Sequence, residues 1–364
     1  MGLTTSFWKN KRVLVTGHTG FKGTWLSFWL IRLGANVKGI SLPPETDPNM
    51  FDLVINKGDM DSAFGDIRDL DYLKKAIADF KPEIIIHMAA QAIVRESYEN
   101  PIETFNTNVM GTANVLESAR YADTLGAVLC ITSDKCYENR EWHWKYREID
   151  PVGGHDPYSA SKGCAELVAS SYRNSFFPKD NYSNHGVGIA TARAGNVIGG
   201  GDWSRDRLIP DCVRAFSKNE DVLIRNPKAV RPWQFILDLL YGYMILTEQL
   251  FKDGETFSGS WNFGPVEDNE KPVGFILDEM KNLWGEDASW KLDEGSNPHE
   301  ASYLKLDSSK ARRELGWAPA LHLQQSLAYV TEWYKSFYAG ENTAEVTEQQ
   351  LSSYMKHRKT EIAS

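Results

Sequence analysis

Two side chains with complementary chemistry stand four residues apart near the middle of the chain. Tyr158 and Lys162 belong to the segment Tyr-Ser-Ala-Ser-Lys, which follows Pro157 and is typical of the start of a helix. Residues four apart share a helix face, so the lysine ammonium can lie near the phenol. A free tyrosine has a pKa of about 10, and a nearby positive charge lowers it. The pair therefore predicts a tyrosine base, although an amphipathic helix shows the same spacing by chance.

A glycine-rich segment follows the first apolar run of the chain, between a predicted strand at 11–16 and a predicted helix at 22–33. In that context one glycine permits a tight turn, the next lets backbone approach a pyrophosphate, and the last lets the helix pack on the sheet. The segment predicts a dinucleotide site. Its expected cofactor-binding residues are Gly17, Thr19, Gly20, Phe21 and Gly23.

The end of the second predicted strand carries an unusual residue for a dinucleotide fold. Ser41 stands where an acidic residue usually receives the adenosine ribose. No arginine follows that strand to hold a 2′-phosphate, so the sequence favours NAD over NADP, with weaker ribose anchoring than usual. Asp66 precedes a predicted helix, where it either accepts a hydrogen bond from the adenine amino group or caps the helix. Spacing leaves both interpretations open.

The first 195 residues alternate between strand and helix patterns, which predicts a parallel sheet. The strand candidates are near-continuous apolar runs, so we expect them to be buried on both faces. They lie at 11–16, 36–42, 83–89, 127–132 and 187–192. Helical patterns lie at 22–33, 70–80, 102–121 and 157–176. The predicted fold class is α/β, a Rossmann-type doubly wound parallel sheet with a smaller C-terminal domain.

The pattern changes after Gly195, where three consecutive glycines and a cluster of Arg and Pro replace the regular alternation. We predict a dinucleotide-binding domain at 1–195 and a smaller second domain at 196–340, with an approximate boundary because the chain can cross between them. Residues 341–364 are rich in Glu, Thr, Gln and Lys and have few apolar anchors. They are expected to form a loosely held tail.

Charge and composition exclude several classes of protein. Forty Lys and Arg against 49 Asp and Glu give a net charge of −9, which does not fit a nucleic-acid-binding surface. The hydrophobic share of 42% is that of a folded globular chain. No window reaches the roughly 18 apolar residues of a membrane span. The four cysteines lie far apart without metal-ligand spacing, so we expect reduced thiols, a cytoplasmic protein and no bound metal.

Three motifs together resemble the extended short-chain dehydrogenase/reductase family, and the resemblance covers nearly the whole chain. They are the glycine loop at 16–23, the Tyr158 and Lys162 pair, and a hydroxyl residue, Ser133, at the end of a strand between them. Within that family, an acid directly after the hydroxyl residue is similar to the nucleotide-sugar 4,6-dehydratases. The resemblance implies a Rossmann fold, NAD as a resident cofactor and a nucleotide sugar as substrate.

The acid after the hydroxyl residue separates branches of this family. Asp134 matches the dehydratase pattern, but Lys135 replaces the glutamate that usually follows. Together with the glycine loop and the segment Arg-Pro-Trp at 231–233, this departure is similar to the dehydratases that act on CDP-glucose. The expected activity is that of a hydro-lyase that converts CDP-D-glucose to CDP-4-keto-6-deoxy-D-glucose.

The resemblance implies roles for five residues in this reaction. Tyr158 removes the C4 hydroxyl proton while hydride passes to NAD, and the C5 proton of the resulting ketone is acidic. Asp134 is expected to protonate the departing C6 hydroxyl, provided that its surroundings keep it protonated. Lys135 either acts as the C5 base when neutral or stays charged and stabilises the C4 enolate. The expected catalytic residues are Ser133, Asp134, Lys135, Tyr158 and Lys162.

Further ligand contacts are implied by the same resemblance. The expected cofactor-binding residues beyond the glycine loop are Ser41, Asp66, Ile67, Ala89, Gln91, Asn108, Tyr158 and Lys162. The expected substrate-binding residues are Ser133, Asn196, Arg205 and Arg231. Arg231 is the candidate pyrophosphate clamp, because a guanidinium binds phosphate through two parallel hydrogen bonds. Asn196 also fits a simple turn, and Trp233 fits either the nucleotide site or the core.

Two alternative functions share part of this pattern. A nucleotide-sugar 4-epimerase uses the same cofactor, Tyr158 and Lys162, but it has no need for an acid–base pair at C5 and C6, so Asp134 and Lys135 argue against it. A non-catalytic NAD-binding sensor has no need for Ser133 beside that pair. The dehydratase reading also implies products that precede deoxy sugars, as in bacterial O-antigen lipopolysaccharide.

The resemblance further implies self-association. Members of the family commonly pair through a four-helix bundle, to which each copy contributes the helix that carries the tyrosine and the helix before the active-site strand. In this chain those helices are expected at 157–176 and 102–121. We therefore expect a homodimer or a dimer of dimers, with no nucleic acid and no membrane as partners.

Overall fold

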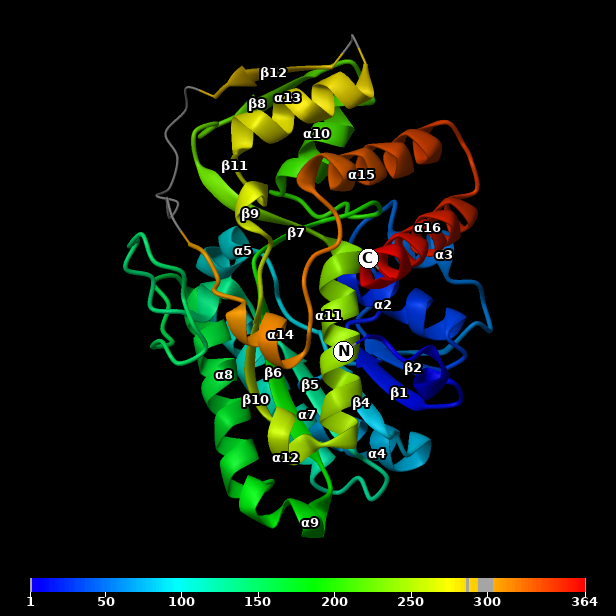
Figure 1. The fold of residues 1–364 in the computed structure, drawn as a ribbon, viewed down its shortest axis with the longest axis vertical. Coiled ribbons are helices and arrows are strands. Elements are labelled where there is room, and N and C mark those ends of the chain that lie inside the picture. The colour runs from blue at the N-terminus through cyan, green and yellow to red at the C-terminus, as the bar shows by residue number, and fades with distance from the viewer. Residues whose placement is uncertain (1, 286–287, 294–303, 364) are drawn as a thin grey trace.

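The computed structural model describes residues 2–285, 288–293 and 304–363, and a parallel sheet of seven strands lies at its centre (Figure 1). The strands are β1 (Arg12–Thr16), β2 (Asn36–Ser41), β3 (Asp61–Phe64), β4 (Ile84–His87), β5 (Ala127–Ile131), β6 (Gly188–Ala194) and β10 (Gly259–Phe263). They lie in the order β10-β6-β5-β4-β1-β2-β3, and all neighbours are parallel. The strand order reverses between β1 and β4, where doubly wound sheets bind ligands. The predicted α/β class is confirmed.

Helices cover both faces of this sheet because successive side chains of each strand point to opposite faces. The longer ones are α2 (Phe21–Arg32), α4 (Leu70–Phe80), α7 (Gly111–Ala119), α8 (Pro157–Ser175) and α11 (Ile236–Lys252). Val13 and Val15 of β1 belong to a core cluster with α2 and α11. Leu14 between them belongs to a second cluster with α4, α7 and α8. The continuous apolar strands predicted from the sequence are therefore buried on both faces.

Two strands of the sheet, β3 and β10, were not predicted from the sequence. β3 is a mostly exposed edge strand with the sequence Asp-Ser-Ala-Phe, so it has no apolar run to mark it. β10 lies beyond the region predicted to form the sheet and pairs with β6. The helix expected over 102–121 is also interrupted: α6 (Pro101–Phe105) and α7 flank a π-helical turn, η1 (Asn106–Met110).

After β6 the chain forms two smaller sheets. One contains β7 (Asn196–Ile198), β9 (Val230–Phe235) and β11 (Glu270–Pro272), and the other pairs β8 (Asp221–Ile224) with β12 (Ser289–Leu292). The helices of this region are α10 (Leu208–Phe216), α13 (Val273–Trp284) and α15 (Leu323–Tyr338), which lie above the main sheet in Figure 1. Between these segments, α11 and β10 return to the main sheet, so the chain crosses between the two regions.

Short helices connect these elements. They are α1 (Thr5–Trp8), α3 (Met50–Val54), α5 (Val94–Glu99), α9 (Tyr182–His185), α12 (Gly254–Phe257), α14 (Ser309–Glu314), and the 3₁₀ turns η2 (Asp134–Cys136), η3 (Lys179–Asn181) and η4 (Glu267–Asn269). No helix in the described ranges is both long and apolar enough to cross a membrane.

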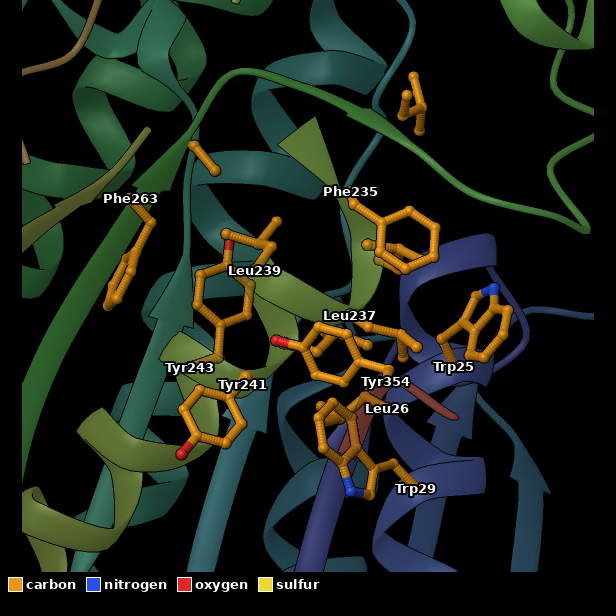
Figure 2. Close-up of a cluster of buried hydrophobic side chains, with 14 of the residues drawn as sticks. Trp25, Leu26, Trp29, Phe235, Leu237, Leu239, Tyr241, Tyr243, Phe263 and Tyr354 are labelled. Atoms are coloured by element: carbon orange, nitrogen blue, oxygen red, sulfur yellow. The ribbon is translucent and has the colours of Figure 1, made fainter. Parts of the chain in front are cut away.

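The expectation of a loosely held tail at 341–364 is wrong. Residues Thr343–Ala363 form helix α16, which packs against α15 and α3. Tyr354 is fully buried between Trp29 and Tyr241 (Figure 2). Its hydroxyl donates to Oδ1 of the buried Asp238 at 2.9 Å, and Arg358 Nη1 lies 3.3 Å from the same oxygen. A few well-placed anchors hold α16, and the composition of the segment does not reveal them.

Candidate active site

The predicted site residues gather at one edge of the main sheet. Gly17 follows β1, Ser41 ends β2, Ala89 follows β4, Ser133 follows β5 and Asn196 follows β6. The carboxyl ends of parallel strands share one edge, so residues spread over most of the first 200 positions are brought together there.

Helix α8 holds the tyrosine and the lysine over the end of β5. Asp156 caps the helix, since its side chain accepts a hydrogen bond from the Ser159 N–H at 2.9 Å. Lys162 Nζ donates to the carbonyl of Ile131, the last residue of β5, at 3.4 Å. The Tyr158 phenol lies near the Ser133 hydroxyl, which favours the ionised form of the phenol and so lowers its pKa. The structure thus brings Ser133, Tyr158 and Lys162 together, all less than 9% exposed.

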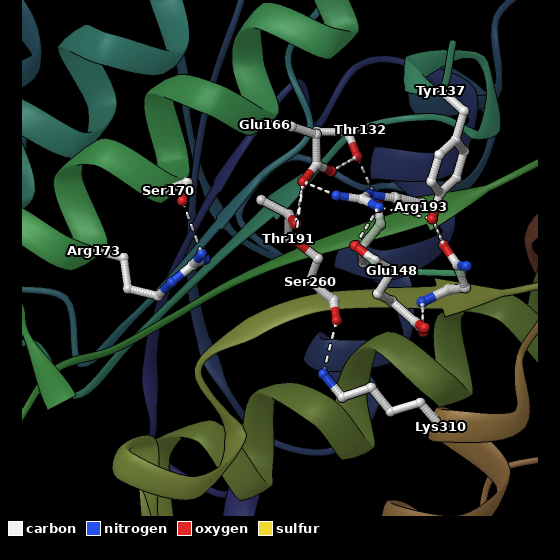
Figure 3. Close-up of polar contacts among 12 residues, drawn as sticks. Thr132, Tyr137, Glu148, Glu166, Ser170, Arg173, Thr191, Arg193, Ser260 and Lys310 are labelled. Atoms are coloured by element: carbon white, nitrogen blue, oxygen red, sulfur yellow. Dashed lines mark hydrogen bonds and ion pairs between the residues drawn. The ribbon is translucent and has the colours of Figure 1, made fainter. Parts of the chain in front are cut away.

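A buried ion pair sets the rotation of α8. Glu166, one turn beyond Lys162, receives a hydrogen bond from Arg193 Nη2 of β6 at 2.7 Å (Figure 3). The Thr132 hydroxyl donates to Glu166 Oε1 at 2.5 Å, and the Thr191 hydroxyl donates to Oε2 at 2.8 Å. Burial opposes ionisation of this carboxyl, but the guanidinium and these donors outweigh it and hold its pKa below the ordinary value. The helix face that carries Tyr158 is thereby locked against β5 and β6.

Burial raises the pKa of both the Tyr158 phenol and the Asp134 carboxyl. Burial raises the pKa of Tyr158 to about 12, although the nearby Ser133 hydroxyl and the charge of Arg207 favour the phenolate. Burial also raises the pKa of Asp134, against the charge of Lys135 and the Ser133 hydrogen bond. A raised carboxyl pKa is what a general acid needs. The cation whose charge lowers the pKa of the phenol is Arg207, whereas the sequence spacing pointed to Lys162.

Arg207 comes from the loop before α10 and was not selected from the sequence. Its Nη1 pairs with Asp202 Oδ2 at 3.0 Å, and the Asp202 carbonyl accepts a hydrogen bond from the Tyr334 hydroxyl of α15. Arg205, the expected substrate ligand two residues earlier, is exposed. The cluster of arginines in this segment indicated that it brings positive charge to the site. Which arginine reaches the site depends on how the loop packs.

The two other expected substrate residues lie near the Asp134 carboxyl. A Cβ atom added to Gly195 would lie 2.9 Å from Asp134 Oδ2 and 3.1 Å from Pro232. Asn196 directly follows that glycine, and Arg231 directly precedes that proline. The starts of β7 and β9 therefore lie next to the acid.

Trp233, two residues after Arg231, belongs to the core. Its side chain is 3% exposed and packs in the main core cluster. Its indole N–H donates to the Lys271 carbonyl at 3.0 Å, so its one polar group is satisfied within the protein. Of the two interpretations of this tryptophan, the structure supports packing in the core.

The glycine loop has the shape that a dinucleotide pyrophosphate requires. Gly17 has φ +78°, and an added Cβ would lie 2.7 Å from the Ala89 nitrogen. At Gly23 an added Cβ would lie 2.0 Å from the Gly17 carbonyl oxygen, because α2 begins close against the turn. Gly20 is exposed, with that same oxygen 3.5 Å from an added Cβ. Backbone approach is thus open at the N-terminus of α2, where an anion is favoured.

The adenosine side of the expected cofactor site is more polar than charged. Ser41 is buried, and its hydroxyl is 2.7 Å from that of Thr19, which donates to the Leu42 carbonyl at 2.9 Å. Asp66 does not cap α4, since Asp69 accepts the capping hydrogen bond from Tyr72 N–H. That finding excludes the capping interpretation for Asp66.

The Asp66 carboxylate is instead held by Arg68, whose Nη2 lies 2.5 Å from Oδ2. Hydrogen bonding to this guanidinium keeps the pKa of Asp66 below its ordinary value. Ile67 is buried beneath Gly111, where an added Cβ would lie 2.3 Å from its Cδ1. The adenine contact of Asp66 stays a prediction.

The π-helical turn orients Asn108. Its Oδ1 accepts from the Gln91 N–H at 2.8 Å, and its Nδ2 donates to the Gln91 carbonyl at 3.0 Å and to the Ser161 hydroxyl at 2.8 Å. Ser161 in turn donates to the Tyr158 carbonyl at 2.7 Å. Gln91 and Asn108 are therefore tied to the first turn of α8, which fits their expected position at the cofactor.

Three polar groups near this site were missed in the sequence. Lys22, in the first turn of α2, forms no hydrogen bond or ion pair with the described residues. Burial and the charge of Arg207 lower its pKa to about 8. The buried amide of Gln234 and hydroxyl of Tyr243 also lack partners in the described chain. A lysine inside a glycine loop and a glutamine inside an apolar strand were the available signals.

Comparisons with known proteins identify the family of this chain. The family model described as GDP-mannose 4,6 dehydratase matches residues 14–330. The chain belongs to this family. The resemblance drawn from the glycine loop, Ser133 and the Tyr158 pair is thereby confirmed. Within the described part of the chain, no group of three or more His, Cys, Asp or Glu is placed to hold a metal ion.

Individual relatives of this dehydratase family support the comparison. The chain is 55% identical over 350 residues to the CDP-glucose 4,6-dehydratase of Salmonella typhimurium, covering 96% of this chain and 98% of that protein. It is 25% identical to the UDP-glucuronate 4-epimerase 4 of Arabidopsis thaliana, covering 91% and 77%. The solved dTDP-glucose 4,6-dehydratase of Bacillus anthracis in complex with NAD has a TM-score of 0.72 at 19% identity, covering 90% and 97%.

Replacement of Lys22 by methionine tests whether this buried charge destabilises the fold. An unfolded lysine has a pKa of 10.5 and the folded one about 8. Between these values the unfolded chain binds more protons, so the stability of the native protein rises with pH. Lys22→Met should raise the free energy of unfolding at pH 7 by roughly 1–3 kcal/mol, and the gain should shrink toward pH 10.5. Urea unfolding at several pH values measures it.

Lys57→Met at an exposed position is the matched control and should change stability by less than about 0.5 kcal/mol. A Lys22→Met protein that is less stable than the parent at pH 7 would show that the ammonium stabilises the native state. Burial and the charge of Lys22 lower the pKa of Lys162, so part of the gain in Lys22→Met comes from relief of Lys162.

Proposed function

We propose that the chain catalyses the NAD-dependent 4,6-dehydration of CDP-D-glucose to CDP-4-keto-6-deoxy-D-glucose, a hydro-lyase reaction. The observation that carries the proposal is the set of residues at the end of β5. There a hydroxyl, a carboxyl of raised pKa and a lysine follow one another, facing the phenol of Tyr158. The 55% identity to an enzyme named CDP-glucose 4,6-dehydratase supports the choice of nucleotide.

The residues divide the chemistry of this reaction among them. NAD would be held by the glycine loop at 16–23 and by the Gln91 and Asn108 pair, and it would supply an acceptor for the C4 hydride and a donor of hydride to C6. Tyr158 removes the C4 hydroxyl proton, and Lys162 supplies positive charge beside it. Lys135 removes the C5 proton of the 4-keto sugar, which the ketone has made acidic. Asp134 protonates the departing C6 hydroxyl, which leaves as water.

Binding of the substrate is assigned to the region around Gly195. Asn196 and Arg231 contact the nucleotide sugar, and Arg231 clamps the pyrophosphate because guanidinium binds phosphate in two parallel hydrogen bonds. Arg207 joins them, since its charge reaches Tyr158. The protein carries a net charge of −9, so this local positive charge is what an anionic substrate requires.

A 4-epimerase or an NAD-binding sensor would not use all of the residues of this site. A 4-epimerase needs no acid at C6, yet Asp134 is 6% exposed and shifted toward the protonated form. A sensor gains nothing from a phenol, a serine and an acid that are all buried at the end of one strand. Burying such groups costs stability, so their presence favours catalysis by elimination.

We place the reaction in the cytoplasm and the product among precursors of deoxy sugars for surface polysaccharide. Support for the first comes from the four cysteines, which are all free in the structure. Support for the second comes from the chemistry, because a 4-keto-6-deoxy sugar offers a carbonyl for further reduction or amination.

Self-association is proposed through the helices η1, α6, α7 and α8. Large apolar side chains are exposed on this face: Ile102 (72%), Met110 (52%), Tyr121 (61%), Leu167 (60%) and Phe176 (43%). α7 and α8 pack beside each other, so these side chains belong to one region of the surface. An exposed apolar face of this kind fits a partner surface, here a second copy of the chain.

Isotope transfer tests the proposed reaction. With CDP-glucose deuterated at C4, the label should appear at C6 of the product, because one cofactor carries it within one active site. Solvent hydrogen should enter at C5. Mass spectrometry and NMR of the product measure both. A ketone that retains its C6 hydroxyl would identify a plain dehydrogenase, and a C4-inverted sugar would identify an epimerase.

Substitution of Lys135 tests its role as the C5 base. Lys135→Met should lower dehydration and C5 exchange with solvent at least about 100-fold while the first hydride transfer continues, so reduced cofactor should accumulate. Lys135→Arg should behave the same way, because arginine keeps the charge but does not give up its proton. Substantial activity in the arginine variant would instead assign Lys135 to charge stabilisation of the enolate.

A charge on the exposed face of α8 tests the assembly. The parent chain of 41.1 kDa should sediment as a dimer or larger at micromolar concentration, and Leu167→Lys should shift it toward the monomer. Leu223→Lys, equally exposed on β8, is the matched control and should leave the sedimentation unchanged. A monomeric parent chain would contradict the proposal.

A further inference from the structure

A buried histidine at the end of β4 joins the central sheet to the helices η1 and α7. His87 is the last residue of β4, is 3% exposed, and pairs in register with Thr16, the last residue of the parallel strand β1. Paired residues of neighbouring strands direct their side chains to the same face. On that face His87 Nδ1 lies 2.7 Å from Thr16 Oγ1, and His87 Nε2 lies 3.1 Å from Thr112 Oγ1 of α7. Both ring nitrogens therefore have a hydroxyl partner.

The other partners of these two threonines fix where the ring carries its proton. The Thr112 hydroxyl donates its one proton to the Asn108 carbonyl, one turn earlier, at 2.7 Å, so it accepts from His87. Thr16 Oγ1 accepts hydrogen bonds at 3.2 Å from both backbone N–H groups of residues 88–89, which occupy its two lone pairs. Its own proton is therefore donated to the ring. Both ends require a neutral imidazole with its proton on Nε2.

A charged or differently protonated ring would leave hydrogen bonds unmade. A proton on Nδ1 would meet an oxygen whose lone pairs are both occupied, and the Thr16 hydroxyl would lose its acceptor. Such losses are costly where both residues are buried. Burial and the charge of Lys162 also oppose a second proton on His87 and lower its pKa to about 3. The neutral ring thus adds no charge beside the lysine of the site.

We propose that His87 is a positioning residue, which as the Nε2–H tautomer holds the turn that places Asn108 in the site. Its N–H orients the Thr112 hydroxyl, and that hydroxyl in turn holds the Asn108 carbonyl. The side chain of Asn108 bonds to the backbone N–H and carbonyl of Gln91 and to the hydroxyl of Ser161. One ring therefore sets the position of η1 against the end of β4.

Two parts of the proposed site depend on this turn. Gln91 is an expected cofactor ligand, and Asn108 fixes its backbone on both sides. Ser161 extends the constraint to α8, because its hydroxyl donates to the Tyr158 carbonyl at 2.7 Å. A displaced turn would weaken the binding of NAD and move the phenol away from the C4 hydroxyl. This role in catalysis rests on the proposed function, whereas the tautomer of His87 does not.

Nitrogen NMR of protein labelled with ¹⁵N-histidine tests the tautomer without any substrate. One imidazole of the parent protein should show a protonated Nε2 and an unprotonated Nδ1, unchanged from about pH 6 to about pH 9. His87→Gln should remove this signal and so assign it. A proton on Nδ1 of His87, or a ring that gains a second proton within that range, would overturn the proposal.

Two amide substitutions separate positioning from stability. His87→Gln places an amide N–H where Nε2 lay and keeps the donor to Thr112, whereas His87→Asn keeps only the acceptor for Thr16. Each variant loses one buried hydrogen bond, so urea unfolding should show similar losses of stability. NAD affinity, measured by calorimetry, should fall at least about tenfold in the asparagine variant and less than about threefold in the glutamine variant. A purely structural role predicts equal losses of affinity, and that result would contradict the proposal.

Substitution of Thr112 tests the second step from the ring to the turn. Thr112→Val removes the hydroxyl and should reproduce the affinity of His87→Asn, whereas Thr112→Ser keeps the hydroxyl and should bind NAD like the parent. In single turnovers with CDP-glucose at saturating NAD, the valine variant should slow the first hydride transfer at least about tenfold. Full affinity and a full rate in that variant would exclude a positioning role.

The same measurements distinguish this inference from the proposed function. A parent protein that shows the Nε2–H tautomer and the expected differences in NAD affinity, but forms no 4-keto-6-deoxy sugar, would refute the proposed reaction and leave the positioning role of His87 in place. A parent enzyme that forms this sugar while both His87 variants bind NAD equally well would support the reaction and refute the positioning role.

Discussion

The buried ion pair between Glu166 and Arg193 is the contact on which the geometry of the site depends. It joins α8 to β6, and through Thr132 and Ser260 it also reaches β5 and β10. Because Tyr158 lies two helical turns before Glu166, a rotation of α8 would move the phenol away from the end of β5. Removing one partner from such a pair costs roughly 3–5 kcal/mol, since it leaves a buried charge uncompensated. The pair therefore specifies an arrangement more than it adds net stability.

The active site itself is electrostatically expensive. Lys22, Lys162 and Arg207 are gathered around Asp134 and Asp202, and burial lowers the pKa of both lysines to about 8. A buried group with more positive than negative charges repels itself, but it attracts a pyrophosphate and stabilises negative charge that develops on a sugar oxygen. Burial of the large, aromatic core elsewhere in the protein offsets this loss of stability.

Residues from the last third of the chain hold in place the loop that carries Asp202 and Arg207. Tyr334 of α15 donates to the Asp202 carbonyl, and Asp202 holds Arg207. Trp333 packs against Gly200, where an added Cβ would lie 2.1 Å from its ring. Helix α16 holds α15 in turn, through the Trp333 indole, which donates to the Thr347 hydroxyl at 2.9 Å. Residues far from the chemistry in sequence thus position the cation that acts on Tyr158.

The sequence by itself determined the features that depend on local spacing. Apolar runs marked the buried strands, the glycine loop marked the turn into α2, and the four-residue spacing of Tyr158 and Lys162 placed both on one helix face. Tertiary structure decided the rest: which arginine of the 201–231 segment approaches the phenol, that β10 completes the sheet, and that α16 is anchored. These outcomes depend on contacts between residues far apart in the sequence, such as Gly259 with Ala190 and Tyr354 with Asp238. Burial and charge at such contacts have no local signature, because they exist only once distant segments pack together.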